Sequence, residues 1–115
     1  RQIVLSTGVV TTLAGTATMA GSSDGSGATA RFDMPHALAF DGAGNLYVAD
    51  TRNHTIRKVA VATGAVTTYV GNPAVGAVQL GALPGAINTP TGIAIGASGE
   101  LYFATAHENA ILVVK

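Results

Sequence analysis

The sequence has no cysteine, no tryptophan and few charged residues. Without cysteine, disulfides and thiolate chemistry are excluded, although the compartment stays open. Lys and Arg together number 6 and are balanced by 6 Asp and Glu, so the formal net charge is zero. A neutral chain has no electrostatic attraction for nucleic acid or an anionic membrane. A nucleic-acid reader would need a basic face with aromatic residues, so we expect no nucleic-acid partner.

A long stretch, residues 59–98, contains no Asp, Glu, Lys or Arg. A membrane-spanning helix needs about 20 consecutive apolar residues. Pro73, Pro84 and Pro90 interrupt every such run, so we expect neutral strands and loops and no transmembrane segment. The chain starts at Arg1 without a signal-like segment, so we expect any targeting segment to be absent or removed.

The residues that are abundant favour β-structure. Thr and Val favour strands, and the 15 glycines favour tight turns. Low charge with abundant Thr, Ala and Gly is also typical of exported bacterial proteins. Composition therefore favours an extracytoplasmic or secreted location without establishing it.

The chain contains an internal repeat. Residues 35–56 align without gaps on residues 90–111 at an offset of 55, with 7 of 22 positions identical. Residues 1–15 align on residues 57–71 at an offset of 56. A repeat at a fixed period predicts a repeat architecture.

One period reads as a four-stranded antiparallel meander. Alternating apolar residues separated by Gly- and Asx-rich turns predict short strands. The expected strands are residues 37–40, 46–49, 55–61 and 65–70. A meander of this size cannot bury both faces alone, and four-stranded repeats are typical of β-propeller blades.

Several stretches resemble NHL repeats of the bacterial type. They are P-x-G-I-A at 90–94, G-N-L-Y-V-A-D-x-x-N-H-x-I-R-K-V at 44–59, T-G-x-V-T-T-x-x-G at 63–71 and DGSGATARFDMP at 24–35. The resemblance covers nearly the whole chain, about two repeats. The second copy departs from the motif, with Thr105, His107, Glu108 and Asn109 where the motif has Asp followed by Asn-His. The resemblance implies a six-bladed propeller.

The frame of the repeats divides the chain into three parts. Residues 1–15 are a partial blade (third and fourth strands), 16–71 an inter-blade loop and a complete blade, and 72–115 a loop and a partial blade (first three strands). Two explanations fit this frame. Either three chains form a homotrimeric six-bladed ring by strand exchange, or the chain is a fragment of a larger propeller.

A polar turn, residues 50–54, is the first candidate site. Asp50 and Asn53 are expected to hold the turn by hydrogen bonds to its backbone. The alternative is surface recognition by Arg52 and His54 at an exposed loop tip. Beyond the turn, Arg57 is expected to be a solvated charge or to form a blade-edge pair.

His36 is the second candidate. It lies where the innermost strand of a blade begins, next to the central channel of a propeller. In a ring of three chains, three copies would supply the ligands of a His₃ site for zinc or another divalent metal. No other cofactor is expected.

The loop between blades is the third candidate. Asp24, Arg31 and Asp33 lie there, and Arg31 is expected to pair with one of the two acids. Loop architecture is the simpler explanation, but such loops line one face of the disc and can hold a ligand.

The sequence favours a non-catalytic function. It contains no Ser-His-Asp order and no carboxylate pair suited to glycoside chemistry. The NHL resemblance implies a protein-binding or structural and assembly platform, whose partner is another protein or the chain itself. The alternative is a propeller enzyme, a lyase or hydrolase with a metal on the central axis.

Overall fold

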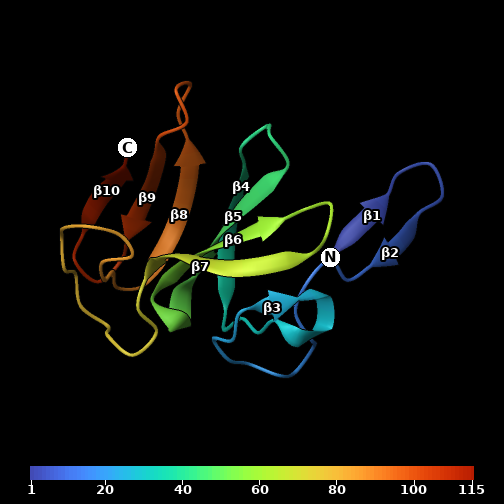
Figure 1. Cartoon of the computed structure of the whole chain (residues 1–115), viewed down its shortest axis with the longest axis horizontal. Coiled ribbons are helices and arrows are strands. Elements are labelled where there is room, and N and C mark those ends of the chain that lie inside the picture. The colour runs from blue at the N-terminus through green and yellow to red at the C-terminus, as the bar shows by residue number, and fades with distance from the viewer.

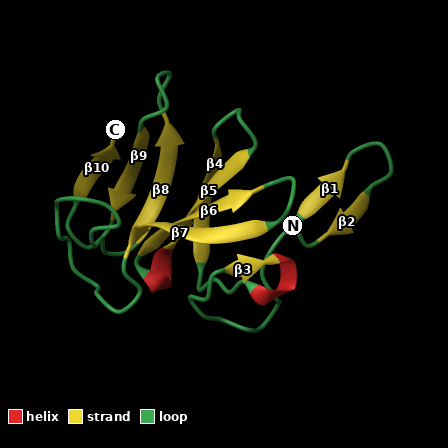
Figure 2. Cartoon of the chain, viewed as in Figure 1, coloured by secondary structure: helices red, strands yellow, loops and turns green.

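A computed structural model describes residues 1–115, which fold into three antiparallel sheets (Figure 1). The strands are β1 (Gln2–Val4), β2 (Val9–Thr11), β3 (Gly25–Ser26), β4 (Pro35–Phe40), β5 (Asn45–Asp50), β6 (Thr55–Ala60), β7 (Ala65–Gly71), β8 (Pro90–Ile95), β9 (Leu101–Thr105) and β10 (Ala110–Val114). Two single-turn 3₁₀ helices, η1 (Gly27–Thr29) and η2 (Thr51–Asn53), are the only helical segments (Figure 2). The predicted all-β fold is confirmed. No helix has the length and apolar character needed to cross a membrane.

The first blade is a meander of β4, β5, β6 and β7, with the short strand β3 added at the outer edge. The four meander strands coincide with the predicted ones, because each is a short apolar or alternating run between two turns. The fifth strand was not predicted. Gly25 and Ser26 pair with Val66 and Ala65, and a two-residue Gly-Ser strand carries no hydrophobic pattern.

The second blade repeats the first three strands, in the order β10-β9-β8. Its inner strand β8 lies against β4 and β5 of the first blade, so the two sheets pack face to face. In both blades the innermost pair of strands has a register shift just after its proline, between Pro35 and Ala37 and between Pro90 and Gly92. The two copies of the repeat thus share even their irregularities.

The hairpin β1–β2 forms its own two-stranded sheet and projects from the body at the N-terminal end (Figure 1). Every residue of both strands is exposed. In the alignment at an offset of 56, this hairpin is the counterpart of β6 and β7. Its sequence is therefore that of the two outer strands of a blade, although β1 and β2 pair only with each other.

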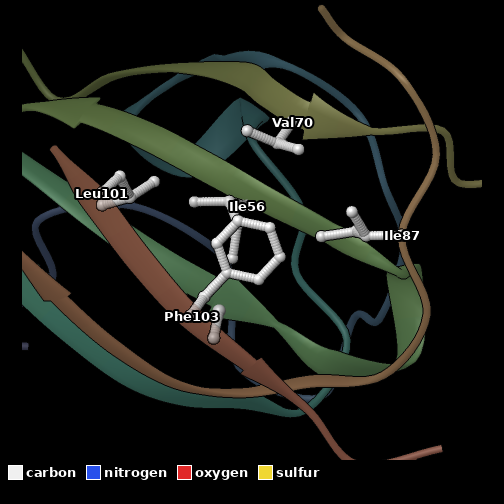
Figure 3. Close-up of a cluster of buried hydrophobic side chains, with 6 residues drawn as sticks. Ile56, Val70, Ile87, Leu101 and Phe103 are labelled. Atoms are coloured by element: carbon white, nitrogen blue, oxygen red, sulfur yellow. The ribbon is translucent and has the colours of Figure 1, made fainter. Parts of the chain in front are cut away.

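The main core lies between the two blades (Figure 3). Its buried members are Ala49, Ile56, Val70, Ile87, Leu101 and Phe103. Figure 3 shows Ile56 pointing into the centre of the cluster, with Phe103 and Leu101 from the second blade around it. Ile87 comes from the loop between the blades, so that loop supplies an apolar plug to the interface.

A second cluster covers the opposite face of the first blade. Its buried members are Ala30, Val48, Val59 and Val66, and Leu13, Ala14, Phe32 and Leu46 pack partly buried against them. Since Ala30 and Phe32 belong to the loop before β4, this loop folds back over the face that the second blade leaves free.

Candidate functional site

The polar turn belongs to a buried network centred on Arg57 of β6. Arg57 is 0% exposed, although the alternation of β6 suggested a solvated charge. Its guanidinium donates to Asp50 Oδ2 at 2.9 Å and to Asp24 Oδ1 at 2.6 Å. It also donates to the carbonyl oxygens of Arg31, at 2.9 Å, and Ser23, at 3.1 Å. The expectation of a solvated Arg57 was therefore wrong, because the loop before β4 closes over the side chain.

Asp50, at the end of β5, is the acceptor at the centre of this network. Its carboxylate accepts from the Asp33 amide at 2.7 Å, from Asn53 Nδ2 at 2.7 Å and from Arg57 at 2.9 Å. The side chain is completely buried. Burial raises the pKa of the Asp50 carboxyl, against the opposing effect of these hydrogen bonds from Asn53, Asp33 and Arg57. All three donors to this buried carboxylate come from the protein itself, as expected for a residue that holds the turn.

Asn53 and Asp24 extend the network into the loop before β4. Asn53 is buried and also donates to the Gly21 carbonyl oxygen at 2.6 Å. Asp24 is half-exposed, and it accepts from Thr68 of β7 as well as from Arg57. Partial burial would raise the pKa of Asp24, but hydrogen bonds from Arg57 and Thr68 outweigh it, so this pKa is lowered.

His54 and Thr51 face the second blade instead. Nδ1 of His54 accepts from the Thr89 amide at 3.1 Å, and the Thr51 hydroxyl donates to the Pro90 carbonyl oxygen at 2.6 Å. His54 adopts a left-handed backbone conformation, with φ of 54°, that closes the turn. The same turn therefore holds its own loop on one side and the start of the next blade on the other.

Arg52, Arg31 and His36 lie outside the ion-paired network. Arg52 is exposed, as the recognition alternative requires, while His54 is half-buried against the second blade. Arg31 pairs with neither Asp24 nor Asp33, so the expected ion pair is not formed. Its guanidinium donates to the carbonyl oxygens of Ala28 and Ala30 at 2.5 and 2.8 Å.

His36 is exposed on β4, at the register shift of the inner strand pair. No three His, Asp or Glu side chains of one chain lie close enough together to hold a metal ion. The predicted His₃ site needs side chains from three copies, so it stays a prediction.

Comparisons with known proteins agree with this architecture. The family model described as NHL repeat matches residues 32–59, which span β4, β5 and nearly all of β6 and include the core of the network. A curated relative, Protein SUPPRESSOR OF QUENCHING 1, chloroplastic, of Arabidopsis thaliana, is 34% identical over 96 residues. That match covers 79% of this chain but only 9% of the relative.

Solved β-propeller structures share the arrangement of the blades. An auxiliary nutrient binding protein from Bacteroides thetaiotaomicron superposes with a TM-score of 0.83 at 23% identity, over 98% of this chain and 31% of that protein. An auxiliary nutrient binding protein from Bacteroides ovatus gives a TM-score of 0.70 at 26% identity, over 90% of this chain and 28% of that one. The chain thus spans about a third of each of these proteins or less.

Proposed function

Since this chain is built of NHL-repeat β-propeller blades, we propose that it is a non-catalytic module that serves as a protein-binding or structural platform. The observation that carries this proposal is the outer face of the second blade. We call it the second-blade open face, and it consists of Gly92, Ala94, Tyr102, Ala104 and Ile111. These side chains have the composition of a protein interior, yet Ile111 is 70% exposed.

The shape of this face suits a protein partner. It forms a shallow, open, almost entirely apolar hollow of about 200 Å³. Small-molecule sites are usually deep and carry a few converging polar groups, whereas a protein interface is broad and apolar at its centre. A contiguous exposed apolar patch of this kind is typical of an association surface.

The polar side chains support the same function. Asp50, Asn53 and Arg57 are buried and engaged with one another and with loop carbonyl groups. These three groups are thus engaged in holding the loop. The description of the Bacteroides ovatus relative as an auxiliary nutrient binding protein also supports a binding role for such blades.

The proposal is tested by substituting an arginine into the second-blade open face, which places a charge on its apolar surface. We expect the wild-type chain to associate in light-scattering measurements after size exclusion, and Ile111→Arg to associate at least tenfold more weakly. Ala62→Arg, in the exposed turn between β6 and β7, is the matched control and should behave as the wild type. Association of Ile111→Arg as strong as that of the wild type would contradict the proposal.

A further inference from the structure

The contact between the two blades of this chain has two halves, and each half occurs a second time on a face that no blade covers. On the first blade the contact uses Ala49 and Ile56, with Ala37 and Tyr47 beside them. On the second blade it uses Leu101 and Phe103, with Ile93, Ile95, Leu112 and Val114 beside them. The repeat therefore contains each half of this contact twice, once packed between the blades and once without a blade against it.

The offset of 55 maps the first half onto the second-blade open face. Ala37, Tyr47, Ala49 and Ile56 correspond to Gly92, Tyr102, Ala104 and Ile111. Ile56 is 0% exposed and Ile111 is 70% exposed. The residues that are buried between blades in one copy of the repeat thus lie open in the other.

The second half maps onto the free side of the first blade, which we call the first-blade open face. Ile93, Ile95, Leu101, Phe103 and Val114 correspond to Leu38, Phe40, Leu46, Val48 and Val59. Leu38 is 64% exposed and Phe40 is 56% exposed, whereas both of their counterparts pack partly buried against the core. This face is the open copy of the surface that receives Ile56.

From these two copies we propose that the second-blade open face of one chain packs, head to tail, on the first-blade open face of a second copy. The proposal rests on the platform function above and names the partner. The first-blade open face contains a half-open, mostly apolar hollow of about 160 Å³, with Arg1 at its lining beside Ala14, Phe32, Leu46 and Val48. An apolar cavity of about 150 Å³ can hold a benzene ring, so an isoleucine side chain fits in this one.

The lining of that cavity repeats the surroundings of Ile56. Phe32, Leu46 and Val48 correspond to Ile87, Leu101 and Phe103, which surround Ile56 between the blades. Ala14 corresponds, at the offset of 56, to Val70 of the same cluster. Ile111 of the second copy is the side chain that corresponds to Ile56, and it is the group expected to fill the cavity.

The segment after β2 already packs on the first-blade open face, as the end of β7 packs between the two blades. A Cβ added to Gly15 would lie 3.2 Å from the Phe32 ring, and one added to Gly71 would lie 3.0 Å from Cγ1 of Ile87. The segment that follows β2 therefore meets its plug residue as closely as the end of β7 does between the blades. The missing part of the contact is the second-blade open face itself.

A hydrogen bond at the edge of the interface is also expected in the contact between two copies. Asn109 corresponds to His54, and Met34 corresponds to Thr89. Both members of each pair have a positive φ, 52° and 54° in the first pair and 52° and 38° in the second. His54 accepts from the Thr89 amide, so the Asn109 side chain is expected to accept from the Met34 amide of the second copy.

The test uses two variants that each block one face. Leu38→Arg blocks the first-blade open face, and Ile111→Arg blocks the second-blade open face. Both positions are largely exposed, so neither change removes a buried contact of the single chain. Each variant alone should be a monomer, whereas an equimolar mixture should give a species of twice the mass of one chain, because one intact face of each kind remains.

The outcomes separate this inference from the platform function. A dimer of either variant alone would mean that like faces pair, and it would overturn the head-to-tail contact. A wild-type chain that associates while the mixture stays monomeric would also overturn it, but would leave the platform function standing. A mixture of Ala62→Arg with Leu38→Arg is the control and should assemble through the second-blade open face of Leu38→Arg.

Discussion

The two copies of the repeat have almost the same backbone but hold their loops in different ways. In the first copy, Arg57 and Asp50 form a buried ion pair that ties the preceding loop to the blade. In the second copy, the corresponding residues are Leu112 and Thr105, and Leu112 packs against the core between the blades. The loop before the second blade is held instead by Ile87 and by contacts from the first blade. The same meander thus forms with a buried ion pair at these two positions or with Thr and Leu there.

This difference shows which part of the motif shapes the blade. The alternation of apolar residues is common to both copies, and both form β-meanders with the same register shift. The ion pair is present in one copy only, so it is not required for the strands. Its role is to close the loop of residues 16–34 over the blade face. Four experiments test this comparison, and the largest effect is expected where a buried charge loses its buried partner.

The strongest test removes the acceptor of the network. Asp50→Ala leaves Arg57 buried without its innermost partner, and breaking a buried ion pair in this way typically costs about 3–5 kcal/mol. We expect a loss of that size in the free energy of unfolding, measured with urea. Thr105→Val, at the corresponding position, keeps the shape of the buried side chain, removes a hydrogen bond to Ala110 and should cost about 1 kcal/mol. Equal losses in the two variants would refute the distinction between the copies.

The second test replaces the ion pair of the first copy by the residues of the second copy. Asp50→Thr combined with Arg57→Leu installs the residues found at positions 105 and 112. Because no unpaired buried charge remains and Asp24 is half-exposed, the double variant should be more stable than Asp50→Thr alone, by about 1–3 kcal/mol of coupling. Asp50→Thr combined with Arg52→Leu is the control, and there the two effects should simply add. A lack of coupling between positions 50 and 57 would mean that the network acts as separate contacts.

The third test concerns the contact from the first blade to the second. His54→Ala removes the acceptor of the Thr89 amide, and such a hydrogen bond contributes about 1 kcal/mol. We expect a loss of that order and faster hydrogen exchange at the Thr89 amide. His107 is exposed, so His107→Ala should change neither quantity. Unchanged exchange at Thr89 in His54→Ala would show that the second blade holds its loop without help.

The smallest expected effect is a pH dependence. The pKa of Asp24 is lowered from 3.8 in the folded chain, so its ionised form adds stability above about that pH, and this contribution is lost as the pH falls through the folded value. Asp24→Asn should therefore be less stable than the wild type near pH 7, by less than about 1 kcal/mol because the carboxyl is half-exposed. Unfolding curves of the two proteins should converge in acid. A difference that stays constant with pH would exclude the carboxylate charge as its cause.

The sequence predicted the meander well because local alternation and turn residues determine it. The strands β4 to β10 lie where the apolar residues alternate, and the turn at 50–54 lies where Asx residues cluster. These features depend on neighbours a few positions away, which a sequence shows directly.

The environment of Arg57 could not be predicted in the same way. Alternation assigns Arg57 to one face of β6, but the burial of Arg57 depends on loop residues that lie 26 to 34 positions earlier in the chain. An arginine on a half-covered strand is normally solvated, so the local pattern favoured the wrong environment. The expected pairing of Arg31 failed for the same reason, since Arg57 takes Asp24.

The network also gives the chain an order of assembly. All the partners of Arg57 lie between residues 23 and 50, so the network closes within one repeat and needs no residue of the second blade. Contacts between segments this near in sequence form early, and domains tend to fold from the N-terminus during synthesis. The loop before the second blade, by contrast, is held by His54 and Thr51 of the finished turn. The first blade can therefore serve as the folding template for the second as the chain leaves the ribosome.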